Sequence, residues 1–252
     1  MIQLQEIPKI RAIIKNAFGV WKSPPKLTIS EWADEKRYLS PEASAEPGKY
    51  KTDRAEYQRG IMDAFSDPAT ERVIVMSSAQ VGKTEILNNI VGYFIDQDPS
   101  TILNLQPTLE MAQTWSKDRL APMVRDNPCL TDKVTESKAK DGKNTILHKL
   151  FPGGHITIVG ANSPAGLASR PIRIVLCDEV DRYPASAGTE GDPVNLAIKR
   201  TTTYWNKKIG LFSTPTLKGI SRIEAAFEES DQRYFYVPCP HCGKYQRLKW
   251  SQ

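Results

Sequence analysis

The chain has 252 residues, of which 40% are hydrophobic and 25% are charged, as is usual for a globular protein. No apolar run approaches the roughly 20 residues that cross a bilayer, and the N-terminus lacks the apolar core of a signal peptide. Four scattered cysteines exclude a disulfide scaffold, and a net charge of +5 permits an anionic partner without indicating one. We therefore expect a cytoplasmic protein with no membrane partner.

Residues 1–71 differ in composition from the rest of the chain. An amphipathic stretch at 7–21 precedes a segment that is rich in lysine, glutamate and proline, with prolines at positions 24, 25, 41 and 47. Proline fixes φ and removes a backbone donor, so these residues predict an extended arm that wraps a domain and does not form its centre.

From residue 72 onward the pattern predicts strands that alternate with helices. We expect strands at 72–77, 101–106, 155–160, 173–178 and 208–213, and helices at 83–98 and 109–124. This alternation implies an α/β fold with a mostly parallel sheet flanked by helices. The expected organisation is the arm at 1–71, the core at 72–232, and the start of a strand–knuckle–strand segment at 233–252.

The stretch SSAQVGKT (77–84) matches the phosphate-loop pattern G-x-x-x-x-G-K-[ST] except that Ser77 replaces the first glycine. Gly82 lets backbone N–H groups turn toward phosphates, Lys83 reaches the β/γ oxygens, and the Thr84 hydroxyl can ligate Mg²⁺. The first glycine mainly relieves the turn after the strand, so a small residue is tolerable there. The alternative is a helix N-terminus that carries Lys and Thr by chance. The predicted ATP-binding residues are Ser78, Gln80, Val81, Gly82, Lys83 and Thr84.

The stretch RIVLCDEVDR (173–182) supplies the acidic half of such a site. Asp178 ends an apolar strand, where it can hold the Mg²⁺ shell, and Glu179 is the candidate catalytic base. A strand that ends in Asp-Glu is common by itself, but with the phosphate loop it predicts a RecA-like (ASCE) P-loop NTPase. Asp181 and Arg182 predict a solvated turn without a function.

Two further segments could complete the site. Ser213 and Thr214 end a strand, where a hydroxyl could sense the γ-phosphate and pass on its loss; the alternative is a plain turn. Arg170 could act as an arginine finger, within its own subunit or into a neighbour. The alternative is that Arg170 and Arg173 are structural or face DNA.

Several segments resemble the lambda-like GpA group of phage terminase large subunits, in the same order along the chain. They are SSAQVGKTE, QPTLEMAQTWSKDRLAPMV, RIVLCDEVDRYP, FSTPT and VPCPHCGKYQRLKW. The resemblance covers nearly the whole chain. It implies a motor that couples Mg-ATP hydrolysis to packaging of double-stranded DNA into a capsid. It also implies a homo-oligomeric ring, a small terminase subunit and a portal protein as partners, and the host cytoplasm as location.

The resemblance implies residue roles as well. Tyr57 could stack on adenine and Gln58 could hydrogen-bond its edge; the alternative for Tyr57 is a partly buried arm residue. FSTPT corresponds to the coupling motif, and QPTLEMA to a helicase-like segment near the DNA path. The family's nuclease domain would lie beyond residue 252, so we expect this chain to hydrolyse ATP and not to cut DNA.

Cys239 and Cys242 form a C-x-x-C pair, which is half of a zinc ribbon. Zn²⁺ is a candidate cofactor only if further ligands come from elsewhere in the protein; otherwise the pair is metal-free. The basic stretches 133–149 and 199–208 could contact DNA phosphates or be solvated surface.

Two other functions stay open at this point. A helicase-like DNA translocase would need a second RecA-like domain. A non-hydrolysing DNA- or partner-binding module would not need the acidic pair Asp178 and Glu179.

Overall fold

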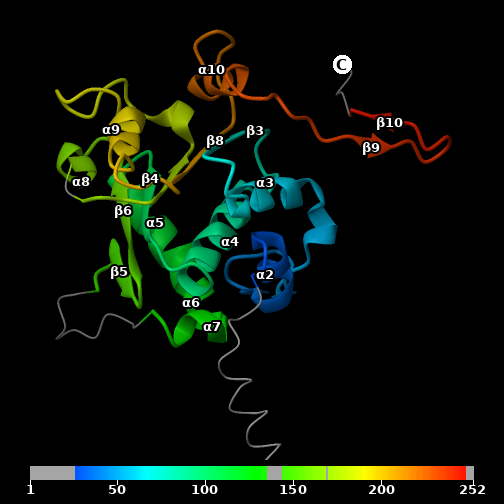
Figure 1. Cartoon of the computed structure of the whole chain (residues 1–252), viewed down its shortest axis with the longest axis horizontal. Coiled ribbons are helices and arrows are strands. Elements are labelled where there is room, and N and C mark those ends of the chain that lie inside the picture. Colours follow the sequence, from blue (N-terminus) through cyan, green and yellow to red (C-terminus); the bar gives the residue numbers. More distant parts are fainter. Residues whose placement is uncertain (1–25, 135–143, 169, 248–252) are drawn as a thin grey trace, which may run out of the picture.

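The computed structural model describes residues 26–134, 144–168 and 170–247, and a six-stranded sheet lies at its centre (Figure 1). The strand order is β3-β8-β7-β4-β6-β5, with β5 antiparallel to β6 and all other neighbours parallel. The strands are β3 (Arg72–Met76), β4 (Thr101–Gln106), β5 (His148–Phe151), β6 (Gly154–Gly160), β7 (Ile174–Asp178) and β8 (Lys208–Ser213). The predicted strands are therefore confirmed to within one residue, and β5 is a strand that the sequence did not predict.

The order of the parallel strands positions the candidate site. β8 lies between β3, which leads into the phosphate loop, and β7, which ends in Asp178. In the register, Met76 pairs with Ser213, and Asp178 pairs with Phe212. Because parallel strands share their carboxyl edge, the phosphate loop, the acidic pair and the FSTPT segment all emerge at one edge of the sheet. The predicted RecA-like P-loop fold is confirmed.

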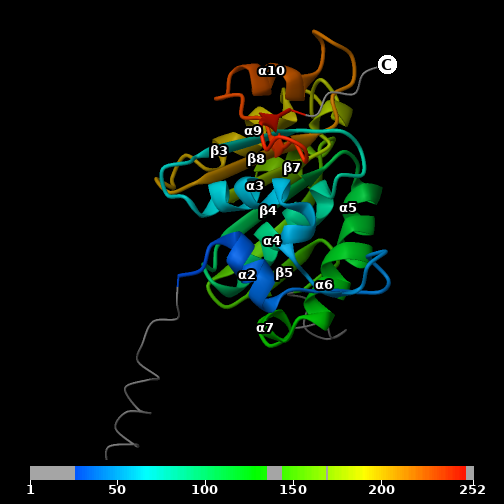
Figure 2. The same cartoon turned by 90° about the vertical axis from the view of Figure 1, so that its right-hand side faces the viewer.

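Helices cover both faces of this sheet. Figure 2 shows α9 and α10 on one side and α2, α4 and α7 on the other. The helices are α2 (Ile29–Lys36), α3 (Tyr57–Ser66), α4 (Lys83–Asp96), α5 (Leu109–Trp115), α6 (Ala121–Asp126), α7 (Pro128–Thr131), α8 (Pro164–Ala168), α9 (Pro193–Lys199) and α10 (Arg222–Glu228). Alternate residues of β4 enter the two cores, since Ile102 packs in one and Leu103 in the other. In the described ranges, no helix is long and apolar enough to cross a membrane.

The helix expected at 109–124 is present and runs without a break from Leu109 to Asp126, but its middle turn is π-helical. A π-helical turn, η2 (Ser116–Leu120), separates α5 from α6. Pro122 lies at the start of α6, and a proline cannot donate to the carbonyl four residues earlier and crowds it. A wider turn before Pro122 relieves that conflict.

The prediction of an extended arm outside the domain centre is wrong for residues 26–71. Trp32 of α2 and Phe65 of α3 are fully buried and belong to the same core as α4. A Cβ atom at Gly92 of α4 would lie 2.3 Å from the Trp32 ring, so the glycine makes room for the indole. Two short strands, β1 (Tyr38–Leu39) and β2 (Gly48–Lys49), and the 3₁₀ turn η1 (Thr52–Ala55) connect α2 to α3.

The C-terminal part of the described chain forms a short hairpin that projects from the body (Figure 1). Its strands are β9 (Val237–Pro238) and β10 (Tyr245–Gln246), which pair antiparallel. The strand–knuckle–strand pattern that the sequence predicted is confirmed for these residues.

Asp96, at the end of α4, joins three separate segments. It accepts hydrogen bonds from the Trp32 indole (2.8 Å), the Lys36 ammonium (3.0 Å) and the Lys133 ammonium (2.6 Å). Burial alone would raise the pKa of Asp96, but these hydrogen bonds outweigh it and lower the pKa to about 2. The carboxylate therefore stabilises the packing of α2 on α4 as long as it is ionised.

We predict that Asp96→Asn lowers the free energy of unfolding by about 1–2 kcal/mol at neutral pH. Because the folded pKa lies below that of the unfolded chain, this contribution is complete above about pH 4 and is lost as the pH falls toward about 2. Urea unfolding at pH 7 and pH 3 measures it, with the exposed Asp132→Asn as control. An equal effect of Asp96→Asn at both pH values would contradict the prediction.

Candidate functional site

The loop between β3 and α4 has the backbone that phosphate binding requires. Gly82 has a φ of +80°, and a Cβ atom there would lie 2.4 Å from the Gln58 amide nitrogen. Gln80 also has a positive φ of 60°. Ser77, which replaces the first glycine, does not have a positive φ, and its N–H continues the β3–β8 ladder to the Ser213 carbonyl (3.2 Å). An L-residue therefore fits at position 77 without strain, whereas position 82 requires glycine.

Lys83 lies at the centre of the site. Its side chain is 6% exposed, and its ammonium donates to the Ser78 carbonyl (3.0 Å) and the Thr214 hydroxyl (2.8 Å). The Glu179 carboxylate lies 3.6 Å away. Since a buried charge is costly unless it is paired and hydrogen-bonded, these contacts from three segments fix the ammonium at the carboxyl edge of the sheet. The predicted neighbourhood of Lys83, Glu179 and Thr214 is thus present.

The acidic pair has two different environments. Asp178 is 7% exposed, and burial, with a further contribution from the neighbouring Glu179 charge, raises its pKa to about 6. Glu179 has a φ of +54°, a left-handed conformation that costs a non-glycine residue about 1–2 kcal/mol. This backbone turns the Glu179 carboxylate toward Lys83 and, at 3.8 Å, toward Arg182. Strain of this kind is common where function constrains a side chain.

Gln106 is a site residue that sequence analysis missed. It ends β4 beside β7, is 2% exposed, and its amide donates to Asp178 (3.4 Å) and to Asn104 (3.3 Å). The resemblance assigned this segment only to the DNA path. A polar residue at the end of an apolar strand that pairs with β7 was the signal that could have identified it.

The chemistry of the Asp178 carboxyl group suits it to hold a cation. In the described part of the chain no lysine, arginine or histidine forms an ion pair with Asp178, although its carboxyl group is buried. Thr84 lies in the first turn of α4, directly after Lys83. A hydroxyl and a carboxylate are ligands that Mg²⁺ accepts, directly or through its waters.

Asp181 is not the free, solvated turn residue that the sequence predicted. Its carboxylate accepts hydrogen bonds from the N–H and hydroxyl of Thr216 (2.9 and 3.0 Å) and from the N–H of Ile223 in α10 (2.9 Å), and its own N–H donates to Ser213 (3.2 Å). Partial burial would raise the pKa of Asp181, but hydrogen bonds from Ser221, Ile223 and Thr216 outweigh it and leave the pKa below its usual value. Asp181 therefore ties the turn after Glu179 to the FSTPT segment and to α10.

Tyr57 and Gln58 hold the phosphate loop from outside. Both donate to the Val81 carbonyl, Tyr57 from its hydroxyl (2.9 Å) and Gln58 from its amide (3.2 Å). Gln58 is buried and also accepts from the Tyr50 hydroxyl (2.7 Å). An amide has four hydrogen-bonding positions, and the contacts that the described residues make to Gln58 occupy two of them, one N–H and one lone pair.

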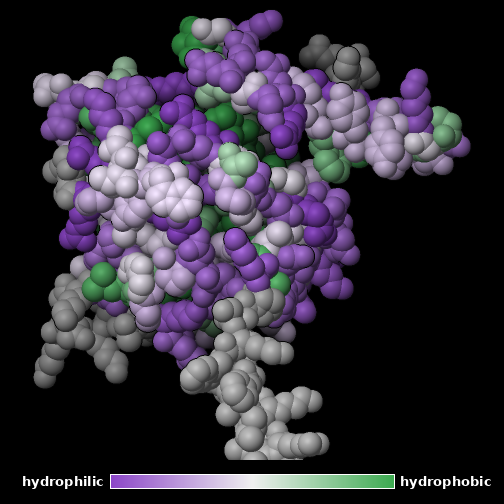
Figure 3. Space-filling view, viewed as in Figure 1, coloured by the Kyte–Doolittle hydropathy of each residue, from purple (hydrophilic) through white to green (hydrophobic). Residues whose placement is uncertain are grey.

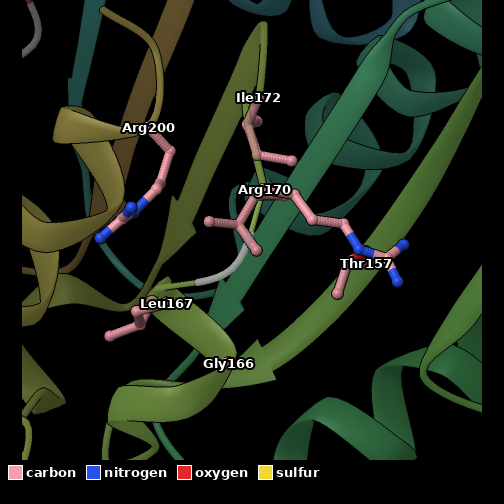
Figure 4. Close-up of a pocket in the computed structure, with 7 residues that line it drawn as sticks. Thr157, Gly166, Leu167, Arg170, Ile172 and Arg200 are labelled. Carbon is pink, nitrogen blue, oxygen red and sulfur yellow. The ribbon is translucent and has the colours of Figure 1, made fainter.

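Arg170 is not close to the phosphate loop of its own chain, so its position does not fit a finger within its own subunit, which was one of the two possibilities left open. Its guanidinium contacts the His148 ring of β5 (3.4 Å), and β5 and β3 are opposite edges of the sheet. Five strand spacings separate them, about 24 Å. Figure 4 shows Arg170 beside a small pocket before β7, with its guanidinium turned away from that of Arg200.

Arg173 is structural, which was one of the alternatives. Its guanidinium forms a bidentate ion pair with Asp98 (2.9 and 2.7 Å), donates to Ser100 (2.7 Å), and lies over the Phe94 ring. These contacts anchor the start of β7 to the connection between α4 and β4.

The described residues do not support a zinc site at Cys239 and Cys242. In residues 26–134, 144–168 and 170–247, no group of three or more His, Cys, Asp or Glu side chains could hold a metal ion. Backbone hydrogen bonds close the knuckle, from Cys239 N–H to Lys244 (2.9 Å) and from Gly243 N–H to Cys239 (2.8 Å). Two thiols are half of the tetrahedral ligand set that structural zinc needs.

Two of the lysines considered as DNA contacts are engaged within the protein. Lys133 is paired with Asp96, and Lys138, Lys140 and Lys143 lie outside the described residues. Lys208 is buried and donates to the carbonyls of Asp67 and Thr70, so the idea that it contacts DNA is wrong.

We predict that Asp178→Asn stabilises the ligand-free protein by about 1 kcal/mol or more at pH 7.5, which raises Tm by about 2–4 °C. The folded pKa of Asp178 exceeds that of the unfolded chain, so the cost of its charge is complete above about pH 6 and shrinks toward about pH 4. Thermal unfolding across this range, with the exposed Asp53→Asn as control, measures it. A lower Tm for Asp178→Asn at pH 7.5 would refute the prediction.

Known proteins resemble the chain in sequence and in fold. The large terminase subunit of Enterobacteria phage P21 is 34% identical over 231 residues, which are 90% of this chain and 36% of that protein. The large terminase subunit of Escherichia phage lambda is 30% identical over 253 residues, 99% of this chain and 39% of that protein. The chain thus spans less than two fifths of these relatives.

The ATPase domain of the Thermus phage P74-26 large terminase has the same fold, with a TM-score of 0.50 at 14% identity over 76% of each chain. Residues 44–252 match the family described as phage terminase large subunit gpA, ATPase domain. This match covers most of the chain. The chain belongs to the gpA ATPase-domain family of phage terminase large subunits.

Proposed function

We propose that this chain hydrolyses Mg-ATP and is the motor part of a DNA-packaging enzyme. The observation that carries the proposal is the buried Lys83 ammonium, held between the Ser78 carbonyl, the Thr214 hydroxyl and the Glu179 carboxylate. A triphosphate on the loop would bring its γ-phosphate to this same point, beside a candidate base. Membership of a family described as an ATPase domain supports this assignment.

The phosphates would lie in the loop and against the first turn of α4. There the N–H groups and the helix dipole favour negative charge. Residues that would contribute are Ser78, Gln80, Val81 and Gly82. Thr84 and, through the water shell, Asp178 would hold Mg²⁺, which when bound neutralises charge on the β- and γ-phosphate oxygens.

Glu179 would accept a proton from the attacking water. As the water oxygen bonds to the γ-phosphorus, the bond to the bridging oxygen breaks, and ADP and phosphate form. Lys83 would exchange its contact with Thr214 for the phosphate oxygens, and would return when phosphate leaves. Ser213 and Thr214 would thereby report the γ-phosphate, with Asp181 transmitting the change to α10.

The adenine would lie on the Tyr57 side of the loop, where the Gln58 amide could reach its edge. Arg170 is exposed, and we propose that it serves as an arginine finger in the site of a neighbouring subunit.

For the longer protein, we propose that hydrolysis drives double-stranded DNA into a capsid in the host cytoplasm. The motor would be a homo-oligomeric ring that works with a small terminase subunit and a portal protein. Endonuclease activity would belong to the remaining part of the longer protein. The description of both relatives as large terminase subunits supports these assignments.

We predict that Glu179→Gln retains ATP affinity within about threefold and lowers kcat about 100-fold or more, because only the proton acceptor is lost. Calorimetric titration with ATP and a steady-state phosphate-release assay measure the two effects. The exposed Glu190→Gln is the matched control. Turnover of Glu179→Gln at the parent rate would contradict the role of Glu179.

We predict that Arg170→Ala also binds ATP but hydrolyses it at least about 100-fold more slowly. Mixing Arg170→Ala with Glu179→Gln should restore part of the activity, since one variant keeps an intact site and the other an intact finger. The exposed Arg54→Ala is the control. If the mixture is no more active than the two variants alone, Arg170 does not act between subunits.

A further inference from the structure

The segment between α10 and β9 brings an aromatic side chain to the outer wall of the phosphate loop. The Phe235 ring packs edge-to-face on the Tyr57 ring, with 6.0 Å between centroids and 73° between planes. The Tyr57 hydroxyl in turn donates to the Val81 carbonyl of the loop. Only one side chain therefore separates Phe235 from the residues that would hold the phosphates.

Both rings are partly exposed to solvent. Phe235 is 50% exposed and Tyr57 is 36% exposed. Figure 3 shows the projection that follows α10 with pale and green, less hydrophilic residues along it. An edge-to-face pair leaves ring faces open, and an open aromatic face can stack with a flat base.

The neighbouring aromatic side chains have other surroundings. Tyr234 packs on Phe227 (5.7 Å between centroids) and lies under the Arg247 guanidinium (3.9 Å), so its ring already contacts two other side chains. Tyr236 is as exposed as Phe235 but makes no ring contact with Tyr57 within the described residues. Phe235 is thus the residue of this segment that faces the loop.

We propose that Phe235 and Tyr57 form the stacking platform for the purine base of the bound nucleotide. The inference rests on the proposed ATP site and specifies its base-binding part. The base extends from the loop toward Val81, stacks on the aromatic pair, and hydrogen-bonds to the Gln58 amide. A residue that follows α10 in the chain thereby completes a site whose other parts precede α4.

This arrangement also links the base to the carboxyl edge of the sheet, where Glu179 lies. Asp181 holds the first turn of α10 through the Ile223 N–H, and the residues after α10 lead directly to Phe235. The same helix is thus joined to the turn that follows Glu179 and to the base platform.

The test separates the base from the phosphates. Calorimetry measures the Kd of the chain for Mg-ATP and for inorganic tripolyphosphate with Mg²⁺, for the parent, Phe235→Leu, Phe235→Trp and Tyr236→Leu. We expect Phe235→Leu to weaken ATP binding about 5- to 100-fold and to leave tripolyphosphate binding within twofold. Phe235→Trp should keep the ATP affinity of the parent, and Tyr236→Leu should change neither Kd.

Three results would overturn the proposal. The first is ATP affinity in Phe235→Leu within twofold of the parent. The second is an equal loss of ATP and tripolyphosphate binding, which would assign Phe235 a structural role. The third is a parent that binds tripolyphosphate as tightly as ATP, which would leave the phosphate loop in place and exclude a base platform. A parent that binds neither ligand would overturn the proposed function itself.

Discussion

The buried ammonium of Lys83 is the interaction on which the site depends. A lone charge at 6% exposure would be costly, and here contacts from three segments offset the cost. The Ser78 carbonyl comes from the loop after β3, Glu179 follows β7, and Thr214 follows β8. One charge thus holds together three segments that are distant in sequence, and a triphosphate would compete for the same ammonium.

The order of the strands and the Asp181 carboxylate determine which segments are connected to Lys83. β8 lies between the loop strand and the acidic strand, so Ser213 and Thr214 are in reach of both. Asp181 connects the same turn to Thr216 and to α10. A few hydrogen bonds therefore connect the contacts of Lys83 to α10 and to the C-terminal part of the chain.

The sequence predicted the structural features that depend on local residue patterns. Strands and the phosphate loop follow from β-branched runs and from the residue types at 82–84, and serine fits at 77 because its φ is not positive. What was missed depends on distant partners: Trp32 is buried because Gly92 makes room for it, and Asp181 is held by residues more than 30 positions later. Arg170 was suggested as an arginine finger, but its place in the fold could not be predicted, because sequence spacing does not give strand order. The adenine roles of Tyr57 and Gln58 remain proposals.

A crystal structure of the chain with Mg²⁺ and a non-hydrolysable ATP analogue would test the role of the Lys83 ammonium. We expect the triphosphate on the 77–84 loop, with the Lys83 ammonium moved from Thr214 to the γ-phosphate and Mg²⁺ beside Thr84 and Asp178. A nucleotide bound elsewhere, or a Lys83 ammonium still on Thr214 with the nucleotide in the loop, would contradict this expectation.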